Sequence, residues 1–320
     1  MRSTELDYAL PTELIAQRPA ERRDAARLLV WDRSTGAVRH RSFAELSEEV
    51  GGYLTVVNDT RVVPGRLRLR RRTGGEVEVL LLEQLDGDRW QALARPSRRL
   101  RAGERLLPRE AAPRGAVDLL EPLGEGRWTV ALEGEPSGEL PLPPYVHQAP
   151  TDPERYQTVY ARDPGSAAAP TAGLHFTPAL LAALDHETVT LHVGLDTFRP
   201  LTAETLEEHA LHGERYRVGA DAWDRIERAD RALAVGTTTT RVLETLARGG
   251  PLEGRTELFI TPGFPFRRVD ALLTNFHLPR TTLLALVMAF AGVEQTRELY
   301  ALAIRERYRF YSFGDAMLVL

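Results

Sequence analysis

The 320-residue chain contains no cysteine and no lysine. The absence of cysteine excludes disulfide bonds, thiolate catalysis and the zinc or iron–sulfur sites that need cysteine ligands. The absence of lysine excludes Schiff-base catalysis and the lysine of a phosphate-binding loop. All 41 basic residues are therefore arginine, whose planar guanidinium group suits phosphate and carboxylate recognition.

Long apolar runs are also missing. Spanning a bilayer takes roughly 18 apolar residues, and the longest candidate, residues 281–292, is shorter and is expected to be a buried helix. The N-terminal segment lacks the basic start, apolar centre and small-residue cleavage site of a signal peptide. A cytoplasmic location is therefore expected.

The common motifs of nucleotide-binding, metal and serine enzymes are absent too. The sequence has no GxGxxG, GxxxxGK[ST], HExxH or GxSxG motif. His209 and His212 have helical spacing, but a zinc site needs three or four ligands and no third stands nearby in the sequence. We therefore expect neither a metal nor a prosthetic group.

The charge of the chain is unevenly distributed. The net charge is −4 in total, yet residues 61–114 contain 14 arginines and seven acidic residues, a net +7 that leaves −11 for the remainder. Such an asymmetry indicates that one part of the chain binds a polyanion.

This basic region also has its own structural pattern. RLRLR at residues 66–70 and EVEVL at residues 76–80 alternate polar and apolar side chains, and glycine-containing turns separate the segments. The pattern is typical of short strands in an all-β unit. We expect an inserted, small, barrel-like all-β domain over residues 64–150.

The flanking residues, 1–63 and 151–320, show a different pattern. Apolar strand-like runs such as residues 53–59 alternate with amphipathic helical segments such as residues 220–229. This alternation predicts one discontinuous, layered α/β catalytic domain in which helices cover both faces of the sheet.

Polar residues directly follow four of the expected strands of the α/β domain. Ligands of open α/β sheets collect at the carboxyl ends of strands, so four polar strand ends predict a shared cleft. These residues are Asn58, Asp59, Thr60 and Arg61 after the first strand, His192, Asp196, Thr197 and Arg199 after the second, Thr237 to Thr240 and Arg241 after the third, and Asn275, His277, Arg280, Thr281 and Thr282 after the fourth.

Two of the segments around these strand ends have a distinctive composition. VGTTTTR, residues 235–241, passes from strand to helix and could bind a carboxylate or phosphate through free N–H groups, hydroxyls and a guanidinium. Ordinary threonine capping of a helix explains it equally well. PGSAAAPTAGLHFT, residues 164–177, has too many small residues for a helix interior and almost no charge. We expect it to approach a flat ligand closely, with His175 and Phe176 forming a hydrogen bond and a stacking contact.

Taken together, these segments resemble a known family. NDTRVVPGRL, PGSAAAPTAGLHFT, TLHVGLDTFRP, AVGTTTTR and YRFYSFGDAML occur in the order found in the S-adenosylmethionine:tRNA ribosyltransferase-isomerases of queuosine biosynthesis. The resemblance runs from LPTELIAQRP near the N-terminus to the C-terminus. It implies the same pairing of an α/β domain with an inserted β-barrel.

The resemblance also implies a reaction. The ribosyl moiety of S-adenosylmethionine would be transferred to 7-aminomethyl-7-deazaguanine at the wobble position of tRNA and rearranged to an epoxycyclopentane. The products would be epoxyqueuosine-tRNA, adenine and methionine. S-adenosylmethionine is then a substrate, and the anticodon region of tRNA is the macromolecular partner.

This chemistry needs a base beside the sulfonium and a proton or hydrogen-bond donor for the departing adenine, both of which histidine can supply. Aromatic rings could hold the sulfonium by cation–π attraction. The expected catalytic residues are His175 and His192 first, then Asp59, Glu214, His277 and Asp315, with base and acid left open. The expected substrate-binding residues are Asn58, Arg61, Thr171, Gly173, Phe176, Thr197, Phe198, Thr237, Thr238, Arg241, Asn275 and Arg280.

The arginine-rich faces of residues 64–150 are expected to contact the tRNA backbone, which makes binding sensitive to salt. The other interpretation is that these arginines only solvate the outside of a barrel. The residues concerned are Arg66, Arg68, Arg70, Arg71, Arg72, Arg95, Arg98 and Arg99.

A few positions differ from the family pattern. Asp196 stands where glycine is usual, Ala167 replaces valine, and Leu211 and Gly213 replace methionine and serine. Asp196 adds a charge to a strand-end loop, but no expected catalytic group is lost. Two alternatives remain open: an S-adenosylmethionine-dependent RNA methyltransferase and a tRNA-binding protein without catalytic activity. No apolar stripe marks a dimer interface, so a monomer is expected.

Overall fold

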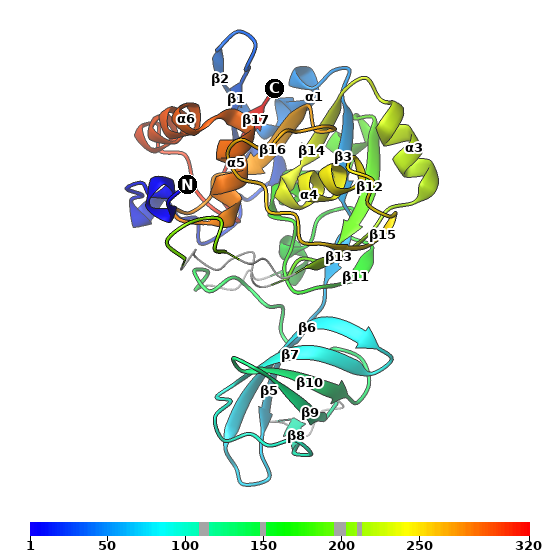
Figure 1. The fold of residues 1–320 in the computed structure, drawn as a ribbon. Helices are drawn as coiled ribbons and strands as arrows, with labels where there is room; N and C mark the ends of the chain where they lie inside the picture. The colour runs from blue at the N-terminus through cyan, green and yellow to red at the C-terminus, as the bar shows by residue number, and fades with distance from the viewer. Residues whose placement is uncertain (109–114, 148–151, 195–202, 210–212) are drawn as a thin grey trace.

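Two lobes of unequal size make up the protein in the computed structural model, which describes residues 1–108, 115–147, 152–194, 203–209 and 213–320. The larger lobe is built on a mixed sheet covered by helices, and the smaller lobe is a ring of strands below it (Figure 1). No helix in these ranges is long and apolar enough to cross a membrane.

The large sheet has nine strands within the described residues. β12, β3, β14 and β16 run parallel to one another in adjacent positions, so their carboxyl ends lie at one edge of the sheet. In spatial order the strands are β15 (Glu253–Thr256), β13 (Glu214–Arg217), β12 (His186–Leu191), β3 (Leu54–Asn58), β14 (Ala232–Val235), β16 (Ala271–Asn275), β17 (Ala316–Val319), β1 (Arg27–Trp31) and β2 (Val38–Ser42).

Helices and apolar clusters cover both faces of this sheet. On β3, Val56 belongs to a core cluster that includes residues of α4, α5 and α6, whereas Val57 belongs to a second cluster on the other face. Alternate strand residues therefore face opposite layers, and the predicted mixed α/β architecture is confirmed. The helices are α1 (Leu46–Glu49), α2 (Pro178–Ala182), α3 (Ala220–Arg228), α4 (Gly236–Leu246), α5 (Thr282–Ala291) and α6 (Val293–Arg305).

Short elements complete the larger lobe. A parallel pair of strands, β4 (Thr60–Val62) and β11 (Asp163–Ser166), continues from the end of β3. Further 3-10 helices lie at Ser3–Leu6, Thr12–Leu14, Arg23–Ala25, Phe43–Glu45, Pro153–Tyr156 and Thr171–His175.

In the smaller lobe, six antiparallel strands of the described chain each pair with two neighbours and so close a ring. On β5, Leu67 and Leu69 are buried while Arg68 and Arg70 are exposed, as the alternation of RLRLR predicts. Trp90 and Trp128 help to fill the interior. The strands are β5 (Arg66–Arg70), β6 (Glu76–Asp86), β7 (Arg89–Arg95), β8 (Arg105–Pro108), β9 (Val117–Gly124) and β10 (Arg127–Leu132).

Arginines at the edge of the large sheet hold the two lobes together. Arg215 on β13 donates a hydrogen bond to the carbonyl oxygen of Gln84 on β6 at 3.0 Å. Arg255 on β15 pairs with Glu83 at 2.5 Å. The ring of strands is thus attached to the lobe that carries the strand ends.

Candidate active site

A pocket lies where the parallel strands of the large sheet end. It contains about 370 Å³ of empty space, part of it open to solvent. None of the acidic side chains or arginines in the described ranges lines it. We call it the strand-end pocket, and its lining residues are Ala169, Pro170, Thr171, Ala172, Val193, Gly236, Thr237, Thr238, Thr274, Asn275, His277 and Leu283.

The N-terminus of α4 forms one side of the strand-end pocket. Gly236 has φ +86°, a left-handed conformation that favours glycine, and this turns the chain from β14 directly into the helix. No side chain of the described residues caps the first turn of α4, so its amide N–H groups are available to an anionic or oxygen-rich ligand. Thr239 and Thr240 instead donate to carbonyl oxygens of their own helix and are fully buried.

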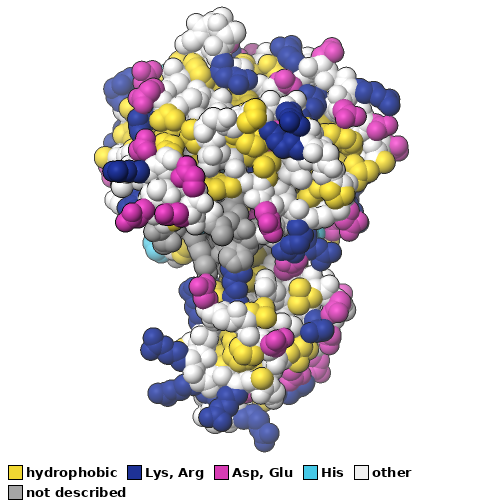
Figure 2. All heavy atoms as spheres, in the orientation of Figure 1, with side chains coloured by type: hydrophobic (Ala, Val, Ile, Leu, Met, Phe, Trp, Pro, Cys, Tyr) yellow, Lys and Arg dark blue, Asp and Glu magenta, His cyan; other side chains and the backbone are white. Residues whose placement is uncertain are grey.

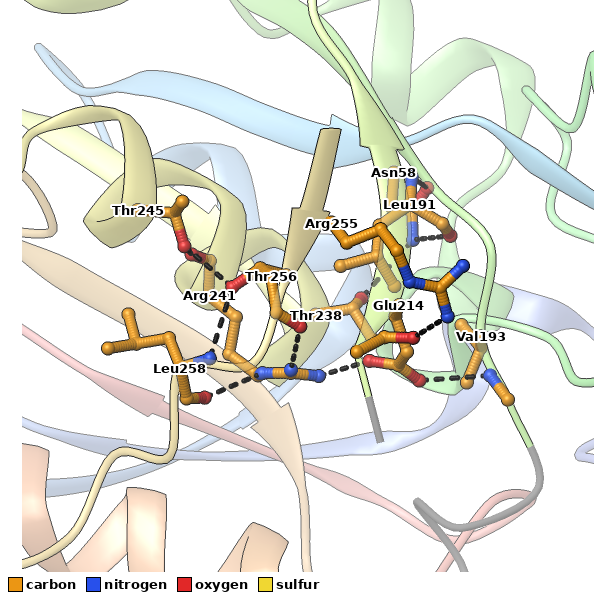
Figure 3. A network of polar contacts seen from close by, with 12 residues as sticks. Asn58, Leu191, Val193, Glu214, Thr238, Arg241, Thr245, Arg255, Thr256 and Leu258 are labelled. Carbon is orange, nitrogen blue, oxygen red and sulfur yellow. Dashed lines mark hydrogen bonds and ion pairs between the residues drawn. The ribbon is translucent and has the colours of Figure 1, made fainter. Parts of the chain in front are cut away.

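Asn58 fixes the relative positions of the elements around the strand-end pocket. Its amide nitrogen donates to the carbonyl oxygen of Leu191 at 3.0 Å and to the hydroxyl of Thr238 at 3.3 Å. Its amide oxygen accepts from the N–H groups of Leu191 and Thr60. Asn58 is fully buried and joins the ends of β3 and β12 to α4, as the upper part of Figure 3 shows.

His175 ends the small-residue run and is held by two neighbours. Its ring packs on Phe43 with centroids 4.9 Å apart, and its Nε2 lies 3.0 Å from the amide nitrogen of Asn275. That same nitrogen donates to the carbonyl oxygen of Asp315 at 3.3 Å. Because a carbonyl oxygen can only accept, the Asn275 nitrogen is the donor, and Nε2 of His175 must be the unprotonated nitrogen.

Burial keeps His175 neutral. Burial, together with the charges of Arg309 and Arg23, lowers the pKa of His175 to about 3. A neutral imidazole is in the protonation state of a base, although the Nε2 lone pair here accepts a hydrogen bond from Asn275. The amide oxygen of Asn275 is also buried and has no hydrogen-bond partner among the described residues, so it is free to accept a hydrogen bond from a ligand.

His277 lies on the wall of the strand-end pocket itself. Its Nε2 is 2.8 Å from the hydroxyl of Thr274, another lining residue. Burial lowers the pKa of His277 to about 3, so this histidine is neutral as well. Thr274 and Gly236 were not among the expected site residues, although both stand next to the apolar runs that marked the strand ends.

His192 is placed beside the strand-end pocket rather than in its lining. Its Nδ1 lies 2.9 Å from the hydroxyl of Thr60, and burial lowers its pKa. The ring packs so closely on Gly165 that a Cβ there would lie 2.8 Å from His192 Cε1. This close approach explains one glycine of the small-residue run.

Three other expected site residues belong to the small-residue run, residues 164–177, and one of them lines the strand-end pocket while two are packed against aromatic rings. Thr171 lines the strand-end pocket. Gly173 packs so closely against the Tyr160 hydroxyl that a Cβ at residue 173 would lie 1.9 Å from it. Phe176 is fully buried in a core cluster and meets Phe43 edge to face.

Two expected catalytic residues, Asp59 and Asp315, do not line the strand-end pocket. Both carboxylates are buried and accept hydrogen bonds from protein groups. Asp59 accepts from the hydroxyl of Thr190 at 2.6 Å and pairs with Arg162 at 2.7 Å. Asp315 accepts from the backbone N–H groups of Arg27 at 2.9 Å and Arg309 at 2.8 Å.

Glu214 and Arg241, which were expected to act separately, form one buried ion pair (Figure 3). Arg241 also donates to the carbonyl oxygens of Leu258 and Thr256, both at 3.0 Å. Glu214 accepts from the N–H of Gly194 at 2.9 Å. The pair therefore links α4 to the edge strands and to the segment that follows β12.

The remaining expected substrate-binding residues lie apart from the strand-end pocket or outside the described ranges. Arg61 pairs with Glu154 at 2.5 Å. Arg280 is exposed at the turn before α5, with φ +56°. Asp196, Thr197 and Phe198 lie outside the described residues.

The arginines of the smaller lobe fall into two groups. Arg66, Arg68 and Arg71 pair with Glu78, Glu139 and Glu104. The exposed Arg72, Arg95, Arg98 and Arg99 have no ion pair with the residues that the structure describes, and Arg70 is exposed too. Since the chain has no lysine, every dark blue side chain in Figure 2 is an arginine, and several gather at the lower end of this lobe.

Known proteins are similar to this chain over its whole length. The model of a family described as "Queuosine biosynthesis protein" matches residues 3–319. A Rubrobacter xylanophilus protein named S-adenosylmethionine:tRNA ribosyltransferase-isomerase is 54% identical over 331 residues, covering 100% of this chain and 98% of the relative. A Moorella thermoacetica protein of the same name is 48% identical over 344 residues and is fully covered, as is this chain.

A solved structure is similar as well. The crystal structure of S-adenosylmethionine tRNA ribosyltransferase from Thermotoga maritima is 38% identical, with a TM-score of 0.56. The match covers 99% of this chain and all of that one.

The buried ion pair between Glu214 and Arg241 should contribute to the stability of the fold. Glu214→Gln leaves the Arg241 charge buried without its partner, which should lower the free energy of unfolding by about 3–5 kcal/mol. The double variant Glu214→Gln/Arg241→Met should recover much of that loss. Urea denaturation measures both, with the exposed Glu227→Gln as control. A single variant as stable as the wild type would rule out a structural role for the pair.

The buried histidines predict a pH dependence of stability. The pKa of His175 and of His277 is 6.5 in the unfolded chain and about 3 in the folded protein. Protonation of these histidines therefore favours the unfolded chain. Their contribution to the free energy of unfolding is complete above pH 6.5 and is lost as the pH falls toward 3. At pH 5, each of the two histidines should make the free energy of unfolding about 2 kcal/mol lower than it is above pH 6.5.

Urea denaturation at pH 7 and pH 5 tests this dependence. His277→Gln should show a smaller drop between the two pH values than the wild type. The exposed His147→Gln should keep the wild-type drop. Equal drops in all three proteins would contradict the assignment.

Proposed function

This chain belongs to the queuosine biosynthesis protein family, and we propose that it transfers the ribosyl moiety of S-adenosylmethionine to 7-aminomethyl-7-deazaguanine at the wobble position of tRNA. The transferred group is rearranged to an epoxycyclopentane, which gives epoxyqueuosine-tRNA, adenine and methionine. One observation carries this conclusion: two relatives named for the activity are 48–54% identical to the chain over its full length.

S-adenosylmethionine occupies the strand-end pocket in this proposal. The amide N–H groups at the start of α4 and the hydroxyls of Thr237 and Thr238 suit the oxygen-rich parts of the molecule. Among the residues that the structure describes, no carboxylate lines the pocket that could hold the sulfonium in its ground state by ion pairing. His277 contributes a neutral imidazole to the wall where adenine can be bound as it departs.

His175 is the proposed base. Nε2 of His175 carries the lone pair and faces Asn275, which lines the strand-end pocket. Asn275 holds the ring in the tautomer with an unprotonated Nε2, and its amide must turn away from Nε2 before that nitrogen takes a proton from the carbon beside the sulfonium. His192, Asp59, Glu214 and Asp315 are proposed to position the surrounding segments, because each of them contacts protein groups there.

Residues 1–63 and 151–320 are proposed to form the catalytic domain, and residues 64–150 an inserted, barrel-like domain that grips tRNA. The exposed arginines without an ion pair among the described residues, Arg72, Arg95, Arg98 and Arg99, support this division of labour. We propose that the protein acts as a cytoplasmic monomer without a metal. No cluster of three or more potential metal ligands occurs among the described residues.

The reaction products test the proposed function. Incubation of the enzyme with labelled S-adenosylmethionine and tRNA carrying the 7-deazaguanine precursor should release adenine and methionine. A methyltransferase would release S-adenosylhomocysteine instead, and a binding protein would release nothing. Chromatography of the small products separates these outcomes, and tRNA lacking the precursor is the control. A reaction without adenine would refute the proposal.

His175→Ala tests the proposed base. It should lower kcat by at least about 100-fold, the lower end of what a general base contributes, while the Kd for tRNA stays near the wild-type value. His147→Ala, an exposed histidine in the same chain, is the matched control and should keep normal turnover. Near-normal kcat in His175→Ala would show that another residue is the base.

A further inference from the structure

A second pocket is lined by His175, whose partner Asn275 lines the strand-end pocket. It contains about 270 Å³ of empty space. We call it the arginine pocket, because three arginines from distant parts of the chain line it. Its lining residues are Pro19, Ala20, Arg23, Arg155, Leu174, His175, Arg309, Ser312, Phe313 and Gly314.

Two of these arginines are bound only to neutral groups. Arg23 donates to the carbonyl oxygens of Leu174 at 3.1 Å and Glu154 at 2.8 Å. Arg155 donates to the carbonyl oxygens of Glu21 at 2.9 Å and Ala20 at 2.5 Å. Carbonyl oxygens satisfy the N–H donors without neutralising the charge.

Neither arginine has an ion pair with a carboxylate of the described residues. The nearby Glu154 carboxylate pairs with Arg61 instead. The Nε of Arg155 is buried and has no hydrogen-bond partner within the described residues. Burial and the like charge of Arg155 lower the pKa of Arg23, and the charges of Asp152 and Glu154 offset part of this effect. The two cations are thus close enough to repel each other.

Arg309 brings the third charge from the C-terminal segment. Gly314 makes the tight turn, since a Cβ there would lie 2.4 Å from the carbonyl oxygen of Arg309. The turn leaves the Arg309 guanidinium 3.5 Å from the Asp315 carboxylate, and the arginine side chain is 37% exposed. Asp315 already accepts two backbone N–H groups, so it offsets only part of the positive charge of the pocket.

We propose that the arginine pocket binds an oxyanion of a substrate, namely a backbone phosphate of tRNA or the carboxylate of S-adenosylmethionine. Guanidinium groups bind both by paired, charge-assisted hydrogen bonds. A bound oxyanion relieves the repulsion between the cations and supplies the acceptor that Arg155 Nε lacks. This proposal rests on the proposed function, because that function supplies the two candidate ligands.

The position of His175 gives this site a role in the reaction. His175 lines the arginine pocket, and its partner Asn275 lines the strand-end pocket. An oxyanion held by the arginines is therefore fixed relative to the proposed base. With S-adenosylmethionine in the strand-end pocket, a tRNA phosphate in the arginine pocket would hold the tRNA backbone next to His175.

Arg309→Gln is the most direct test, because Arg23 and Arg155 also tie chain segments together through their carbonyl contacts. The Kd for precursor tRNA is measured by filter binding at several salt concentrations, and the Kd for S-adenosylmethionine by calorimetry. One of the two should rise about tenfold or more, as expected for a lost charge-assisted hydrogen bond. If tRNA is the ligand, the salt dependence should also fall by about one phosphate contact.

The outcomes separate the two ligands. Weaker binding of tRNA alone identifies a phosphate, and weaker binding of S-adenosylmethionine alone identifies its carboxylate. Unchanged Kd values for both, in a variant with the wild-type Tm, would overturn the proposal. Arg225→Gln removes a surface arginine that pairs with Asp185 and Glu187, and this control should bind both ligands normally.

Lysine variants of the other two arginines test whether all three arginines bind the same ligand. Arg23→Lys and Arg155→Lys keep the charge but lose the planar fork, so they should weaken binding of the same ligand as Arg309→Gln does. Weakening of the other ligand would contradict a single site. Adenine release by the wild type is scored separately, so failure of the proposed function is distinguishable from failure of the arginine pocket.

Discussion

One amide nitrogen organises the centre of this protein. The Asn275 side chain donates to the Asp315 carbonyl oxygen and to His175 Nε2. The first contact fixes the orientation of the amide, and the second therefore fixes the tautomer of the histidine. Since Asn275 ends β16 and Asp315 precedes β17, the pairing of these two strands sets the position of the proposed base.

The two pockets that flank His175 differ in their electrostatics. The strand-end pocket presents hydroxyls, amide N–H groups and a neutral histidine, whereas the arginine pocket has three guanidinium groups, one of them 3.5 Å from the Asp315 carboxylate. Burial and the charges of Arg309 and Arg23 together keep His175 neutral. The arginines thus have two effects, because the charge that attracts an oxyanion also preserves the lone pair of the histidine.

The larger lobe carries both pockets, while the smaller lobe carries exposed arginines that have no ion pair within the described residues. Arg215 and Arg255 join the lobes at the edge of the large sheet. A polyanion bound along the smaller lobe would therefore be held by a structure anchored to the strand-end region. In the proposed function, this arrangement separates affinity for the RNA backbone from the chemistry at the proposed base.

The sequence by itself determined the α/β layering, the strand alternation of RLRLR and the shared edge of the polar strand ends, because hydrophobic periodicity and strand direction are local properties. It did not indicate that Glu214 neutralises Arg241, or that Phe176 lies in the core. It also did not indicate the arginine pocket, whose residues come from the N-terminal, middle and C-terminal parts of the chain. Tertiary structure alone decided these contacts, because they depend on how distant segments pack and on which rotamers that packing allows.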